Sequence, residues 1–311
     1  MAAYALRRLL GMVPTLLAIL LLSFLLVRLS PGSPFSQERA LAPEVRAALD
    51  ARYGLDKPVW AQFGQYLWAL GHGDLGPSIR YPDRQVRELI VLALPHTLLL
   101  GSMALVWGLG AGLTVGIAGA YGAMVGRNRL QLVTLMLTTL AQSLPSFVLG
   151  PLLVLTFAVG LDVLPPAGWG TLRHVLLPAL TLGTVLAAHV ARLSYGGLCE
   201  IRRTEFVRTA YAKGLTPGTI LRRHMLIPGL MPLITYLGPA ISGILVGSVA
   251  TERIFCVPGL GPYFVDAALN RDYFLIMGIV LLESVLLLFC NLAVDLVCAW
   301  LDPRIRMGHG R

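Results

Sequence analysis

Charged residues are scarce in this chain, and that scarcity excludes most classes of soluble protein. Asp, Glu, Lys and Arg make up 13% of the 311 residues, hydrophobic residues make up 56%, and the mean hydropathy is +0.73. Such a composition is typical of a membrane protein. Because the apolar runs reach the length of a membrane-spanning helix, the chain is expected to be all-α and polytopic.

The sequence also lacks the short motifs of nucleotide and peptide hydrolases. It has no G-x-x-x-x-G-K-[ST] phosphate loop, no G-x-S-x-G nucleophile elbow and no H-E-x-x-H metal pair. Gly259-Leu260-Gly261 is followed by Pro262, so it is not a dinucleotide fingerprint. We therefore expect no catalytic residue and no bound cofactor, and active transport would need energy from a partner or an ion gradient.

Cysteine is rare as well. Four are present, none in a C-x-x-C pair or in a His/Cys cluster with metal-ligand spacing: Cys199, Cys256, Cys290 and Cys298. We expect no metal site, and we expect Cys290 and Cys298 to be packing residues. The sequence does not exclude a disulfide between helices, but no feature of it supports one.

Six apolar runs are long enough to cross a bilayer, and Pro145 and Pro151 should kink the third because each removes a backbone donor. The predicted spans are Leu9 to Leu29, Thr97 to Tyr121, Leu130 to Val159, Val175 to Tyr195, Leu230 to Ala250 and Phe274 to Leu301. The first run is about 20 residues long, against roughly 7–15 for a signal peptide, and favours a retained anchor.

The basic residues concentrate on one side of this topology. With the N-terminus in the cytoplasm, the cytoplasmic segments carry thirteen Lys and Arg residues against three acidic ones, whereas the first external loop carries seven of each. This asymmetry follows the positive-inside pattern. It places both termini in the cytoplasm and accounts for most of the net charge of +9 without nucleic acid.

The predicted organisation has four parts. Residues 1–30 form an anchor helix, 31–93 an external helical insertion, 94–302 a five-helix transmembrane domain, and 303–311 a cytoplasmic tail. In the insertion, helices should begin near Pro43 and Pro58, and Asp83 should cap a third helix. That third helix would carry Val86, Leu89, Ile90 and Ala93 on one side.

Small and ionisable residues stand out at membrane depth. Gly108, Gly112 and Gly116, like Gly243 and Gly247, are four residues apart and predict close helix packing. His189, Arg192, Glu283 and Asp295 should face other helices, a partner or water because isolated charge is costly there.

The segment at about 198–228 combines basic residues with helix signals. Arg208, Ala210 and Gly214 are expected to share one helical face, Thr216 to cap a second short helix, and Pro217 to take its first position. Such a hairpin predicts a docking surface for a cytosolic protein. The alternative is an ordinary positive-inside loop.

The residues of this segment resemble a known family. Glu205 to Pro232 is similar to the EAA loop of type I ABC importer permeases, and Phe206 to Leu215 to its peptide/nickel version, F/Y-[IV]-R-T-A-R-A-K-G-L. The resemblance continues at Pro31 to Phe35, His72 to Ser78, Pro145 to Phe147, Pro258 to Gly261, Asn270 to Tyr273 and Asp302 to Arg306. Tyr211, where the family has Arg, and Pro228 depart from the pattern.

The resemblance implies a type I importer permease fold with six spans in a bacterial inner membrane. It implies a second, homologous permease, two cytosolic ATPases that hold ATP and Mg, a periplasmic or lipid-anchored binding protein, a peptide substrate and surrounding lipid. Coupling to the ATPases would fall to Glu205, Arg208, Ala210, Lys213, Gly214, Leu215, Thr216, Pro217, Ile220, Arg222 and Arg223. Candidate pathway or gate residues are Gln142, Ser143, Pro145, Ser146, Ser242 and Glu283.

Ser33 matches the oligopeptide-type pattern rather than the dipeptide-type P-G-D-P. A permease for dipeptides, nickel chelates, opines or glutathione is the alternative. A self-sufficient secondary carrier would show inverted repeats and midplane ion ligands, and the sequence shows neither.

Overall fold

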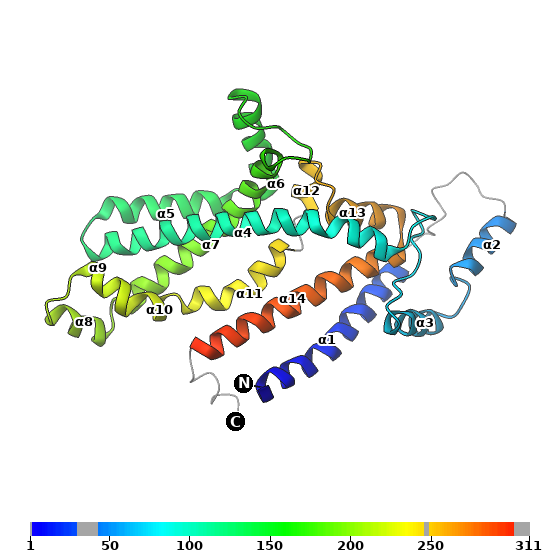
Figure 1. Cartoon of the computed structure of the whole chain (residues 1–311), viewed down its shortest axis with the longest axis horizontal. Coiled ribbons are helices and arrows are strands. Elements are labelled where there is room, and N and C mark those ends of the chain that lie inside the picture. The colour runs from blue at the N-terminus through cyan, green and yellow to red at the C-terminus, as the bar shows by residue number, and fades with distance from the viewer. Residues whose placement is uncertain (1, 30–42, 246–248, 302–311) are drawn as a thin grey trace.

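The computed structural model describes residues 2–29, 43–245 and 249–301. Every regular element within these ranges is helical (Figure 1), which confirms the all-α prediction. Five helices there are long and apolar enough to cross a membrane, and a sharply bent pair makes a sixth. The tail at 303–311, the Pro31 to Phe35 segment and Gly247 lie outside the described residues.

Helices α4 (Val86–Met124) and α7 (Leu172–Ile201) form the central pair. A Cβ at Gly112 would lie 2.6 Å from the Ala187 carbonyl oxygen, and one at Gly116 would lie 2.6 Å from that of Ala191. Only glycine allows this approach, so the packing prediction for the first glycine series is confirmed. Gly243 differs, because a Cβ there has nothing within 4 Å.

The third helix predicted for the insertion is wrong as a separate element. Val86 to Ala93 are the first turns of α4, which follows Gln85 rather than Asp83 and runs through Pro95 into the predicted second span. Val86, Leu89 and Ile90 pack against Leu275 and Ile279. This burial stabilises the helix across the hydrogen bond that Pro95 removes.

The predicted third span is broken rather than kinked. Helix α5 (Asn128–Ser143) and the following α6 (Ser146–Leu153), which continues into a π-helical segment η1 (Val154–Gly160), are bent by 102° where Pro145 intervenes. In Figure 1, α5 runs beside α4 and α6 turns away from it. Pro151 is accommodated inside α6.

The remaining spans lie on one side of the central pair. Helix α1 (Ala2–Leu29) packs along α14 (Tyr273–Leu301), and α11 (Met231–Leu245) packs on α14 from the other side (Figure 1). Arg8 in α1 pairs with Asp295 in α14 at 3.2 Å, so this membrane-depth acid faces a neighbouring helix. The predicted fifth span covers α11 and the start of α12 (Val249–Ile254).

Short helices occupy the two ends of the bundle (Figure 1). At one end lie α2 (Pro43–Arg52) and α3 (Val59–Gly71), which begin near the prolines predicted to start them, and α13 (Leu260–Asn270). At the other end lie α8 (Glu205–Ala212), α9 (Pro217–Ile220), the π-helical turn η2 (Leu221–Met225) and α10 (Leu226–Gly229).

Candidate functional site

The hairpin, defined here as residues 202–229, is anchored to the ends of α4 and α7. Val207, Ile220 and Met225 are almost fully buried against Leu198 of α7 and Ala120 of α4. The Arg202 guanidinium also donates to the Ala123 carbonyl at the end of α4, at 2.6 Å. The hairpin is therefore a packed extension of the two central helices.

The expectation that Arg208 and Ala210 share a helical face is wrong. Residues two positions apart in an α-helix are separated by about 200° around its axis, so Arg208 and Ala210 point to opposite sides. Ala210 is 5% exposed and belongs to the buried cluster, whereas the Arg208 side chain is 73% exposed and pairs with Glu205 at 3.0 Å.

The other predicted coupling residues also include both buried and exposed side chains. Ile220 is buried inside the chain, and Leu215 and Pro217 are half-buried. The exposed members are Glu205, Arg208, Lys213, Gly214, Thr216, Arg222 and Arg223. Two exposed aromatic residues of α8, Phe206 and Tyr211, belong to the same surface and were missed. Their positions on the outer side of an amphipathic helix were the available signal.

The turn between α8 and α9 depends on Gly214. Its φ is +78°, a left-handed conformation that glycine adopts without strain. A Cβ there would meet nothing within 4 Å, so the space beside it is open. Thr216 takes the N-cap position and Pro217 the first position of α9, as predicted, but the Thr216 hydroxyl bonds the Thr219 hydroxyl at 3.0 Å instead of a backbone N–H.

A cavity of about 350 Å³ lies where the α5–α6 bend meets α7 and α11. Gln142, Pro145 and Ser146 line it, together with His189 of α7 and Tyr236 of α11. The two rings stack with centroids 5.9 Å apart. The cavity therefore offers polar and aromatic groups within a helix bundle.

The polar groups at this cavity are held in place by hydrogen bonds. The Arg192 guanidinium donates to the Gln142 Oε1 atom at 2.7 Å, and Gln142 Nε2 donates to the Ala188 carbonyl at 3.3 Å. These bonds tie the last turn of α5 to α7. His189 was singled out from the sequence only as an ionisable group at membrane depth.

Three predicted pathway residues lie elsewhere. Ser143 is exposed and donates to Thr139 of its own helix, and Ser242 is buried and bonds the carbonyls of Gly238 and Pro239. Both hydroxyls satisfy a preceding turn, which short hydroxyl side chains do readily in helices. Glu283 is half-buried in α14, away from the cavity lining.

At the opposite end of the bundle, two buried carboxylates connect neighbouring segments through hydrogen bonds. Glu252 of α12 accepts from the Thr97 hydroxyl of α4 at 2.8 Å and from the Gly261 N–H at 2.7 Å. Asp272 accepts from the Ser78 hydroxyl, from the Arg80 N–H at 3.1 Å and from the Leu275 N–H at 3.1 Å. The turn-rich His72 to Ser78 segment and the Asn270 to Tyr273 segment therefore meet in space.

The described residues hold no group of three His, Cys, Asp or Glu side chains that could bind a metal, and the four cysteines are free.

Residues 108–307 match the model of a family described as "Binding-protein-dependent transport system inner membrane component". The chain belongs to this family. It is thus a multi-pass membrane protein of a binding-protein-dependent transport system, and its helices can be interpreted as membrane spans.

Curated relatives match over the full length. The oligopeptide transport system permease protein OppB of Haemophilus influenzae is 42% identical, over 98% of this chain and 100% of the relative. OppB of Salmonella typhimurium is 40% identical with the same coverage. The dipeptide transport system permease protein DppB of Bacillus subtilis is 39% identical, over 99% of each chain.

The fold is shared with a chain of a solved ABC transporter. A chain of the MetNI methionine ABC transporter in an inward-facing conformation superposes with a TM-score of 0.57 at 20% identity, covering 70% of this chain and 97% of that one. The expected type I importer permease fold is confirmed.

Proposed function

We propose that this chain is one of two permease subunits of an ATP-driven importer of oligopeptides, and that its hairpin takes up the motion of cytosolic ATPases. The observation that carries the proposal is the hairpin itself, which presents basic and aromatic side chains outward while its inner side is packed on α4 and α7. Because its buried side chains pack directly on α4 and α7, a movement of the hairpin would be transmitted to these two helices.

The path from hairpin to cavity runs along one helix. Leu198, which packs against the hairpin, and His189, which lines the cavity, both belong to α7. They are nine residues apart, or about 14 Å along a rigid helix axis. A tilt of the hairpin would therefore move α7 as a rigid helix and displace the cavity wall that His189 forms. Differential contacts of the ATPases with the hairpin in their two states would bias the direction in which the cavity opens.

The assembly proposed for the chain has ATP and Mg on two ATPase subunits, a homologous permease as the other half of the pathway, and a periplasmic or lipid-anchored binding protein that delivers peptide. The hairpin faces the cytoplasm, with both termini on the same side, and α2, α3 and α13 face outward. The relatives named for oligopeptide transport and the residue Ser33 favour oligopeptides. The 39% identical dipeptide permease keeps dipeptides as the second candidate.

Replacing Gly214 with Trp tests the coupling role. The indole would project into the open space beside the turn, where a docked ATPase must approach, so we expect ATP hydrolysis by the complex to lose its dependence on peptide-loaded binding protein and uptake to stop. The matched control is Gly126→Trp. Gly126 also has a positive φ, +74°, and open space around it, but lies in the α4–α5 turn at the same end of the bundle. Normal uptake by Gly214→Trp, or equal loss in both variants, would refute the assignment.

Growth of a deletion strain on single peptides as the sole source of an essential amino acid tests the substrate class. We expect this chain to restore growth on oligopeptides, which the names of its relatives favour. Rescue on dipeptides alone would replace oligopeptides by the second candidate, while leaving the coupling experiment unaffected.

A further inference from the structure

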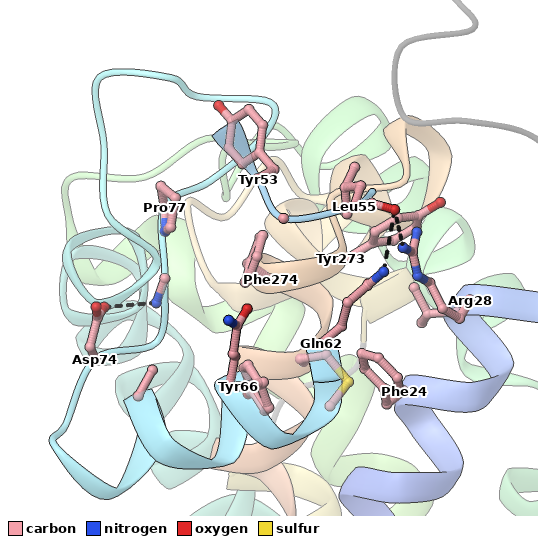
Figure 2. Close-up of a pocket in the computed structure, with 16 residues that line it drawn as sticks. Phe24, Arg28, Tyr53, Leu55, Gln62, Tyr66, Asp74, Pro77, Tyr273 and Phe274 are labelled. Atoms are coloured by element: carbon pink, nitrogen blue, oxygen red, sulfur yellow. Dashed lines mark hydrogen bonds between the residues drawn. The ribbon is translucent and has the colours of Figure 1, made fainter. Parts of the chain in front are cut away.

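A second cavity, of about 220 Å³, lies far from the hairpin, between α1, α3 and α14. Figure 2 shows its residues converging from the end of α1, the α2–α3 turn, the loop after α3 and the start of α14. Its walls are mostly apolar and include Phe24, Tyr53, Leu55, Phe274 and Met277. The transport mechanism proposed above gives this cavity no role.

One edge of the cavity carries a positive charge. The Arg28 Nη2 atom donates to the Leu55 carbonyl at 3.0 Å, and the guanidinium carbon lies 5.5 Å from the centre of the Tyr273 ring. These contacts orient the guanidinium and use one of its five donors. Within the described part of the chain Arg28 has no acidic partner in an ion pair. Asp74, the acid at the cavity, lies at the opposite edge (Figure 2), where it accepts from the Gly76 N–H at 2.9 Å.

The cavity borders a lipid-facing surface. On α1, Leu26 and Leu29 are 72% and 78% exposed and flank the cavity-lining residues Val27 and Arg28. On α3, Trp60 and Trp68 are 81% and 70% exposed, and Trp68 adjoins the lining residue Ala69. Exposed tryptophans at the end of a spanning bundle mark the interface between headgroups and acyl chains. The cavity therefore lies at headgroup depth.

We propose that this cavity is a phospholipid site. The phosphate is bound by the guanidinium donors of Arg28 other than the one that bonds the Leu55 carbonyl, and the first part of one acyl chain enters the apolar cavity. Since a cavity of 150 Å³ holds benzene, one of 220 Å³ has room for about nine carbons. The remainder of the chain would extend along the exposed leucines of α1. A free fatty acid shares this chemistry, an anionic group on an alkyl chain, and has to be separated from a phospholipid by experiment.

The proposal is tested with the full chain, and any subunits that co-purify, in nanodiscs. These contain a phospholipid with a photoreactive group on the part of one acyl chain that lies next to the headgroup. Mass spectrometry of the cross-linked protein should find label on peptides that contain Phe24, Tyr53 or Met277. Arg28→Gln should reduce this labelling at least ten-fold, because the charge-assisted hydrogen bonds to the phosphate are lost. Ala69→Leu, which fills the cavity from α3, should reduce it as much.

Two controls match these variants. Arg80→Gln removes the same charge from an exposed side chain outside the cavity, and Ala61→Leu adds the same bulk on the exposed side of α3. Both should label like the unmodified chain. Intact insertion of all variants is checked by size-exclusion chromatography, and if Ala69→Leu fails to insert, Arg28→Gln decides alone.

Three results would overturn the proposal. The first is absence of label at the cavity, and the second is equal labelling in Arg28→Gln and Arg80→Gln. The third is displacement of the label by equimolar fatty acid or by a short peptide, which would assign the cavity to that ligand instead. The outcome does not depend on the peptide-import proposal.

Discussion

At the scale of single residues, two buried acids at the α13 end of the bundle accept hydrogen bonds from segments that are far apart in the chain. Glu252 and Asp272 are fully buried, and each bridges segments far apart in the chain. A buried carboxylate is tolerated only when its oxygens are bonded, and both oxygens of each acid are. Neither residue could be assigned this role from sequence, because their partners lie 155 and more than 190 positions away.

Asp272→Asn should lower the thermal stability of the purified chain. The amide presents an NH₂ group to one of the donors that the carboxylate now accepts from, which leaves a buried donor unpaired at a cost of about 2 kcal/mol. Asp74→Asn is the matched control, because Asp74 is exposed. Unfolding followed by cysteine accessibility in detergent should show a lower midpoint for Asp272→Asn alone. Identical midpoints would contradict the bridging role.

At the scale of helices, the junction between α7 and the hairpin depends on one of two adjacent glycines. A Cβ on Gly197 would lie 2.1 Å from the Gly229 carbonyl oxygen of α10, whereas one on Gly196 has nothing within 4 Å. The sequence shows only a Gly-Gly pair. Which glycine is required follows from the direction in which α10 packs.

Gly197→Ala should separate α7 from α10 and disturb coupling. We expect peptide-stimulated ATPase activity to fall strongly in the assembled complex, since the new methyl group overlaps backbone that cannot move alone. Gly196→Ala should leave it unchanged or stabilise the helix by up to about 1 kcal/mol. Equal activity of the two variants would show that the junction is looser than the geometry indicates.

Some helix boundaries were predictable and others were not. The starts of α2, α3 and α9, at or next to Pro43, Pro58 and Pro217, agree with the fixed φ of proline. Pro95 and Pro145 had the same local signal but opposite outcomes. Apolar packing on α14 holds α4 continuous through Pro95, while α5 and α6 diverge at Pro145. Local propensity does not distinguish these cases, because tertiary contacts decide them.

At the scale of the whole molecule, the two ends of the bundle have different characters. One end carries the basic hairpin and the other carries α2, α3 and α13 (Figure 1). Helix α4, at 39 residues, is about 58 Å long and exceeds a bilayer of about 45 Å including headgroups. Its first turns therefore extend into the insertion and are covered by α14.

The proposed orientation predicts which cysteine is accessible from outside. In intact cells, a membrane-impermeant maleimide should label Cys256, which is exposed between α12 and α13. The other three cysteines are replaced by serine for this measurement. Thr209→Cys, on the exposed side of α8 in a chain that lacks all native cysteines, should react only after the cells are broken. The reverse pattern would invert the topology.

The sequence by itself determined the fold class, the approximate positions of the spans and the basic hairpin, because the length of the apolar runs and the distribution of charge decide which segments enter the bilayer and on which side the loops lie. Its motifs also indicated the family. The tertiary structure decided that Gln142, Pro145 and Ser146 share a cavity with His189 and Tyr236, and that α1, α3 and α14 enclose a second one. Those relations depend on how helices rotate and pack against distant neighbours, and residue spacing along one helix carries no information about its partner.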